Sequence, residues 1–140
     1  IINNNNEKKL TCFVPVRYNS TRLPGKPLLK FDNKTSVELL YEKIKTIKYI
    51  KKIIFLTDQE NIKNHVESLG AECHIVEEYC SSGTDRIGIF LKKSKDSDNE
   101  SFIMNIQGDE PFINPKNVEK CIENYFNTIE KNKIKCFCLY

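Results

Sequence analysis

Arginine is rare in this chain and confined to three short segments. Of its 22 lysines and arginines, only Arg17, Arg22 and Arg86 are arginine, and each lies in a segment that contains glycine together with proline or serine. A guanidinium presents its N–H donors in a rigid plane that matches two oxygens of a phosphate or carboxylate at once, which an ammonium cannot do. The three arginines therefore indicate a binding site for an anion.

Two of the arginines share a loop, residues 15–27, that directly follows the apolar residues 10–14. Hydroxyl and backbone N–H groups of such a loop can contact phosphate oxygens while its cations add positive charge, which suits a triphosphate. The candidate residues are Arg17, Ser20, Thr21, Arg22, Gly25 and Lys26. The spacing is neither that of a P-loop nor that of the dinucleotide fingerprint. The alternative interpretation is a surface loop with solvated charges.

A second candidate site follows the apolar residues 102–106. Here Gly108 precedes Asp109, whose carboxylate would extend from the end of a strand and could bind a hard cation such as Mg²⁺. Gln107 has a side-chain amide that could orient a substrate. The alternatives are a turn carboxylate, because Gly-Asp-Glu-Pro is also a favourable turn sequence, and a solvated glutamine.

The third arginine ends the segment Ser-Gly-Thr-Asp-Arg at residues 82–86, at the start of a predicted helix. The free N–H groups and macrodipole of a helix N-terminus favour an anion or a polar base edge, although capping alone explains Ser82 and Asp85. Arg86 is unfavourable to the dipole in this first turn, so we expect it to have a ligand or a carboxylate partner.

Alternating strand and helix patterns surround these motifs. Short apolar runs predict buried strands at residues 11–14, 52–56, 73–76, 102–106 and 134–139. The first helix opens with a capping box at residues 35–38, the second follows Asp58 and ends at Gly70, the third is capped by Ser82, and the fourth begins at Asn114 and Pro115. This alternation predicts an α/β, doubly wound, Rossmann-like fold: a mainly parallel sheet with helices on both faces.

Parallel α/β sheets bind ligands at the carboxyl ends of their strands. Residues 15–27 and 107–111 both follow predicted strands, so we expect them at the same edge of the sheet. His65 and His74 lie outside the motifs and are expected to be structural.

Length and composition limit the function classes. The chain has 140 residues, 39% of them hydrophobic, which predicts one core: a nucleotide-binding α/β domain at residues 10–140 after a polar segment at residues 1–9. Its net charge of +3 includes no basic block, so nucleic acid is not an expected partner. No apolar run approaches the roughly 20 residues that span a bilayer, so we expect a soluble intracellular protein. The six cysteines are expected to be reduced thiols.

Four segments resemble, in order, the motifs of the 3-deoxy-manno-octulosonate cytidylyltransferases, or CMP-Kdo synthetases. They are residues 15–28, 57–58, 82–86 and 105–111. The resemblance implies a cytoplasmic or organellar nucleotidyltransferase of lipopolysaccharide biosynthesis that uses Mg²⁺ to move CMP from CTP to the acidic sugar Kdo. The products would be CMP-Kdo and pyrophosphate. It also implies a homodimer at full length.

The resemblance assigns roles to individual residues. Arg17 and Lys26 would neutralise charge on the triphosphate, and Asp109 would hold the metal. Other matching positions would line the nucleotide and sugar pocket; these are Ser82, Arg86 and Gln107. Cys80 is a departure, because the family has a histidine near this position.

Members of the family are longer than this chain, so we expect it to correspond to their N-terminal part, truncated at the C-terminus and inactive alone. One alternative is a cytidylyltransferase for another acidic sugar, such as sialic acid. The other is a non-catalytic nucleotide-binding fragment or a degenerate paralogue.

Overall fold

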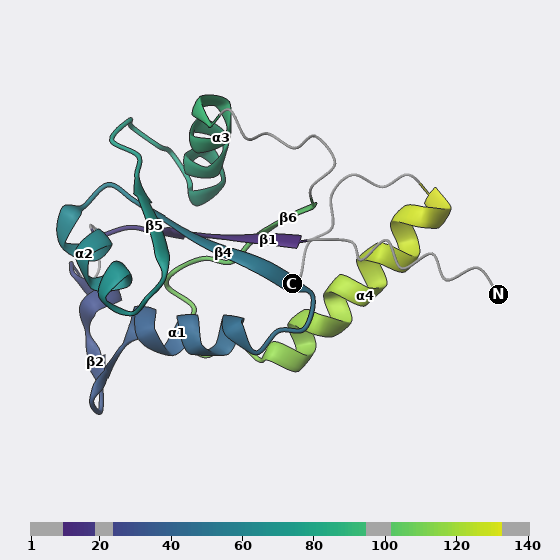
Figure 1. Ribbon diagram of the computed structural model, residues 1–140, viewed down its shortest axis with the longest axis horizontal. Helices are drawn as coiled ribbons and strands as arrows, with labels where there is room; N and C mark the ends of the chain where they lie inside the picture. Colours follow the sequence, from purple (N-terminus) through teal and green to yellow (C-terminus); the bar gives the residue numbers. More distant parts are fainter. Residues whose placement is uncertain (1–9, 19–23, 95–101, 133–140) are drawn as a thin grey trace.

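A parallel sheet forms the centre of the protein (Figure 1). The computed structural model describes residues 10–18, 24–94 and 102–132. Within them, four parallel strands lie in the order β5-β4-β1-β6; these are β1 (Leu10–Val16), β4 (Ile50–Thr57), β5 (Glu72–Ile75) and β6 (Phe102–Asn105). Four of the predicted strands are thereby confirmed. The fifth prediction, residues 134–139, lies outside the described residues.

The order of the strands reverses beside β1. From β1 the chain adds β4 and then β5 towards one edge, and afterwards returns to place β6 on the other side of β1. In sheets of this kind, ligands bind outside the carboxyl ends of the strands at the point of reversal. The fold therefore locates the expected ligand crevice between the ends of β1 and β6.

Helices cover both faces of the sheet, which confirms the doubly wound arrangement. In Figure 1, α3 (Gly83–Lys93) lies on one side, while α1 (Ser36–Lys45) and α4 (Pro115–Asn132) lie on the other. The second helix, α2 (Glu60–Ser68), contributes to the same core as α1 and α4. The connection after β1 contains the 3₁₀ turn η1 (Lys26–Leu28) and a small hairpin of β2 (Lys30–Phe31) and β3 (Lys34–Thr35).

The predicted helix caps are present. The Thr35 hydroxyl accepts a hydrogen bond from the Glu38 N–H at 3.2 Å, and the Ser82 hydroxyl accepts one from the Asp85 N–H at 3.0 Å. Asn114 accepts one from the Lys116 N–H at 3.0 Å. These side chains satisfy N–H groups that have no partner within their helices, and so fix where α1, α3 and α4 begin.

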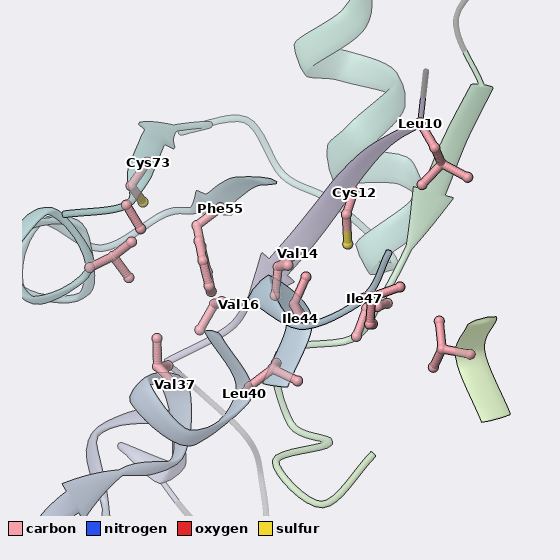
Figure 2. Packing of buried hydrophobic residues seen from close by; sticks show 14 of the residues in the cluster. Leu10, Cys12, Val14, Val16, Val37, Leu40, Ile44, Ile47, Phe55 and Cys73 are labelled. Atoms are coloured by element: carbon pink, nitrogen blue, oxygen red, sulfur yellow. The ribbon is translucent and has the colours of Figure 1, made fainter. Parts of the chain in front are cut away.

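Alternate side chains of the strands enter two separate cores. On the α1 face, Val14 and Val16 of β1 meet Val37, Leu40 and Ile44 of α1 (Figure 2). On the α3 face, a smaller cluster contains Phe13, Ile54, Leu56, Val76, Cys80 and Ile87. Because neither face of the sheet is left to solvent, its central strands can be almost entirely apolar.

The cysteines of the described residues are free thiols, as predicted. Cys12, Cys73, Cys80 and Cys121 are buried and unbridged. Burial raises the pKa of the Cys12 and Cys73 thiols to about 12, which keeps both protonated at neutral pH. Across the described residues, no helix is long and apolar enough to cross a membrane.

Candidate functional site

The two motifs predicted to share an edge of the sheet are brought together there. The ammonium of Lys26, at the start of η1, lies 3.9 Å from a carboxylate oxygen of Asp109, which follows β6. The two side chains are 39% and 64% exposed, so both are accessible to a ligand. A cation and an acid thus lie together beside the carboxyl ends of β1 and β6.

Backbone bonds close the loop that carries Lys26. The N–H of Gly25 donates to the carbonyl of Tyr18 at 3.0 Å, across the segment that holds Ser20 and Arg22. Gly25 has a φ of +74°, a left-handed conformation that glycine adopts without strain. Ser20 and Arg22 themselves lie outside the described residues, so their predicted phosphate contacts remain predictions.

Close packing against β1 fixes the position of Asp109. The N–H of Gly108 donates to the carbonyl of Pro15 at 3.0 Å. A Cβ at residue 108 would lie 2.7 Å from a methyl carbon of Val16 and 2.9 Å from the Pro15 carbonyl oxygen, so a larger residue would force the two segments apart. Glycine at this position allows Asp109 to leave the sheet beside the loop that follows β1.

Gln107 lies against the N-terminus of α3. Its amide N–H donates to Asn105 Oδ1 at 3.0 Å, and Asn105 Nδ2 donates to Thr84 Oγ1 at 3.1 Å. A Cβ on Gly83 would stand 2.6 Å from Gln107 Oε1, which shows how closely the two segments approach. Ser82 is nearby in sequence, with its hydroxyl engaged as the helix cap.

A cavity of about 360 Å³ opens at the carboxyl ends of β1, β4 and β5. Its lining combines both signs of charge with an exposed aromatic ring; the residues are Arg17, Asp58, Glu77, Glu78, Tyr79, Cys80 and Arg86. Arg17 donates to the carbonyl of Cys80 at 3.4 Å, which links the end of β1 to the segment between β5 and α3. Sequence reasoning proposed two of these residues, Arg17 and Arg86, as ligand contacts.

Arg86 has the carboxylate partner that its unfavourable helix position predicted. Its side chain is 4% exposed; one amino group lies 3.4 Å from Asp58 Oδ2 and the other donates to the Val76 carbonyl at 3.0 Å. The Nε atom of Arg86 is buried and has no hydrogen-bond partner among the described residues. Arg86 therefore joins the end of β4 to the end of β5 from within the protein.

Asp109 is the residue that the sequence analysis proposed as a metal ligand. Within residues 10–18, 24–94 and 102–132, no three His, Cys, Asp or Glu side chains gather as a metal centre would require.

The two histidines make structural contacts, as expected: His65 lies 2.7 Å from the Thr35 hydroxyl, and His74 lies 2.8 Å from a Glu72 carboxylate oxygen.

Comparison with known proteins identifies one group of relatives. A family model described as cytidylyltransferase matches residues 11–136. An 8-amino-3,8-dideoxy-manno-octulosonate cytidylyltransferase of Shewanella halifaxensis is 36% identical over 113 residues, covering 81% of this chain and 46% of that protein. A 3-deoxy-manno-octulosonate cytidylyltransferase of Thermodesulfovibrio yellowstonii is 36% identical over 116 residues, covering 80% and 46%. The chain thus spans about half the length of these curated relatives.

Solved structures agree with this result. A CMP:2-keto-3-deoxy-manno-octonic acid synthetase in complex with CTP superposes with a TM-score of 0.76 at 30% identity, covering 85% of this chain and 48% of that one. A cytidylyltransferase from Leptospira borgpetersenii superposes with a TM-score of 0.68 at 24% identity, covering 89% and 51%, and supports the fold alone.

Proposed function

This chain belongs to the cytidylyltransferase family, and we propose that it provides the nucleotide-binding part of an enzyme that transfers CMP from CTP to Kdo, an acidic sugar. The observation that carries the proposal is the approach of Lys26 to Asp109 at the point where the strand order reverses. The resemblance of four motifs to the Kdo cytidylyltransferases, and the names of the relatives, support the choice of substrates.

The residues at the strand ends suit nucleotidyl transfer. The anomeric hydroxyl of the sugar attacks the α-phosphorus of CTP, and the bond to the leaving pyrophosphate breaks. Negative charge shifts to the pyrophosphate as this happens, so fixed cations beside it stabilise the transition state. Arg17 and Lys26 are the described cations of the loop after β1, and Arg22 of the same loop is proposed to assist them.

We propose that Asp109 holds a divalent ion, Mg²⁺, together with phosphate oxygens of the nucleotide. Mg²⁺ is commonly bound through one or two carboxylates, substrate phosphates and water, so a single accessible carboxylate fits this ion. Asp109 is 64% exposed and lies beside the cation that would contact the triphosphate. When bound, the ion would neutralise charge on the phosphates. The Gln107 amide and the start of α3, with Ser82, are proposed to border the substrates.

Nucleotide binding tests the proposal on the chain itself. We expect CTP with Mg²⁺ to bind more tightly than ATP, GTP or UTP, measured by isothermal titration calorimetry with each nucleotide. Equal affinity for all four, or no binding of any, would contradict the assignment. The Asp109→Asn variant should bind CTP in EDTA as the unaltered chain does, and should lose most of the gain in affinity that Mg²⁺ provides.

We make two further proposals, which concern the acceptor sugar and the oligomeric state. The relatives' names include both Kdo and its 8-amino derivative. The acceptor sugar can therefore be tested by comparing Kdo, 8-amino-Kdo and sialic acid. The assay measures pyrophosphate release by a protein of the relatives' length. Greatest release with sialic acid would favour the alternative cytidylyltransferase. We expect a protein of that length to be a cytoplasmic homodimer.

A further inference from the structure

Two exposed phenylalanine rings lie against each other a few positions after Lys26 and Asp109 in the sequence. Phe31 belongs to β2 and is 43% exposed, and Phe112 follows β6 and is 71% exposed. Their ring centroids are 5.5 Å apart and the ring planes meet at 78°, which is an edge-to-face arrangement. Large apolar side chains that gather on a surface mark a contact or a function, because burial alone does not explain them.

The two rings connect the segments that carry the proposed site residues. The Lys26 segment, residues 25–31, contains η1 and enters β2, and the Asp109 segment, residues 107–112, follows β6. One contact between these segments is the ion pair of Lys26 with Asp109, whose charged atoms lie 3.9 Å apart on exposed side chains. An exposed ion pair of this kind contributes little and cannot fix the spacing of two segments. The contact between the rings is a second link.

The hairpin that carries Phe31 is attached to α1 (Figure 1). β2 pairs with β3, and Lys34 of β3 donates to both carboxylate oxygens of Glu42 on α1, at 2.7 and 2.8 Å. At the base of the hairpin, the Ser36 N–H donates to the Leu29 carbonyl at 3.0 Å. Because α1 belongs to the main core, Phe31 presents its ring from a fixed support.

Phe112 is held between this hairpin and α1. The residues on either side of it are anchored in the protein, since Pro111 is buried and Ile113 packs against the main core. The Phe112 ring itself lies at the surface, where it meets Phe31, and the ammonium of Lys43 on α1 stands 5.4 Å from its centroid. An edge-to-face pair and a cation–π contact each favour the bound arrangement by up to roughly tenfold in an equilibrium constant.

We propose that Phe31 and Phe112 are positioning residues that hold the Lys26 segment and the Asp109 segment at the spacing a metal-bound triphosphate requires. The inference rests on the proposed function and extends it to residues that touch no substrate. Mg²⁺ demands near-ideal octahedral geometry, so an ion shared by Asp109 and phosphate oxygens tolerates little displacement. The ammonium of Lys26 has a flexible stem and adapts more easily. Loosening the ring contact should therefore weaken the binding of metal-bound nucleotide more than the binding of nucleotide alone.

Replacing each ring with alanine tests the contact. The quantity measured is the Mg²⁺ gain, defined as the ratio of the dissociation constants of CTP in EDTA and in Mg²⁺, from calorimetry on the chain. We expect Phe31→Ala and Phe112→Ala each to reduce the Mg²⁺ gain roughly 3- to 10-fold while leaving the affinity in EDTA within about twofold. The double variant should lose no more than the larger single loss, because either substitution removes the contact. An unchanged Mg²⁺ gain in either single variant, or losses that multiply in the double variant, would overturn the proposal.

Phe112→Tyr and Ile103→Ala are the control variants. Tyrosine keeps an aromatic ring that can meet Phe31 and Lys43, so we expect Phe112→Tyr to retain the Mg²⁺ gain within about twofold. Ile103 is an apolar residue of β6 that is 47% exposed and lies outside both segments, so its truncation should not change the gain. If Ile103→Ala lost as much as Phe112→Ala, the effect would come from a general loosening of β6 and the positioning role would be wrong.

A measurement without nucleotide separates this inference from the proposed function. In NMR spectra of the free chain, Phe31→Ala should shift the backbone amide signal of Asp109, and Phe112→Ala should shift that of Lys26. If these shifts appear but Mg²⁺ adds nothing to the CTP affinity of the unaltered chain, the two segments are coupled as inferred and the proposed metal role fails. If Mg²⁺ strengthens CTP binding but neither variant reduces the gain, only the inference fails. Absence of both shifts would overturn the inference whatever the nucleotide result.

Discussion

Replacing Lys26 with methionine should lower turnover of CTP roughly 10²- to 10³-fold in a protein of the relatives' length. Methionine preserves most of the length of the side chain but removes the charge that lies 3.9 Å from Asp109. Loss of one fixed group that stabilises charge developing in a transition state commonly has an effect of this size. The measurement is the rate of pyrophosphate release at saturating CTP, Kdo and Mg²⁺.

Lys92→Met is the matched control for this variant. Lys92 is exposed in the last turn of α3, whereas the residues proposed for the site follow the strands or lie at the start of that helix. We expect turnover by this control within about twofold of the unaltered protein. A Lys26→Met variant that keeps full turnover would identify Lys26 as a solvated loop residue, which was the alternative interpretation of its motif.

Arg86→Met should destabilise the chain by about 2–3 kcal/mol, among the largest effects of any single substitution at the site. The substitution leaves the Val76 carbonyl without its donor and Asp58 without its cation. Breaking a fully buried ion pair costs about 3–5 kcal/mol, but Asp58 is partly exposed and water can solvate it, so the expected loss is smaller. Urea unfolding followed by circular dichroism measures this quantity.

Two further variants provide the comparison for the unfolding free energy of Arg86→Met. Lys92→Met, on the same helix, should change the free energy of unfolding by no more than about 0.5 kcal/mol, as is usual for exposed positions. Asp58→Asn should cost less than Arg86→Met, because it keeps Arg86 bonded to Val76. If Arg86→Met is as stable as the control, the contacts of the buried guanidinium do not contribute to folding.

The strands and helix caps that position the site could be predicted because each is specified by neighbouring residues in the sequence. The apolar run before Arg17 and the run before Gln107 specify two strands, and the fixed handedness of crossovers then brings their ends to one edge. The caps at Thr35, Ser82 and Asn114 are similarly local and are all present. The approach of Lys26 to Asp109 therefore follows from patterns that can be read without a structure.

The cavity could not be predicted in the same way, because its wall depends on contacts between distant residues. Arg17 meets the Cys80 carbonyl across 63 positions of sequence, and no local pattern specifies that contact. The partner of Arg86 could be expected to be an acid, but Asp58 was one of several acids available. Its identity follows from the packing of α3 over the ends of β4 and β5.

The measurement that tests the central claim most directly is an NMR titration of the isotopically labelled chain with CTP and Mg²⁺. The structure has a second cavity of about 370 Å³ at the start of β4 and β5, lined by residues that include Tyr41, Lys45 and Lys52. We predict that CTP shifts the backbone amide signals of Arg17, Lys26, Asp58 and Asp109 and leaves those of the second cavity unchanged. Shifts confined to the second cavity would contradict a nucleotide site at the carboxyl ends of the strands.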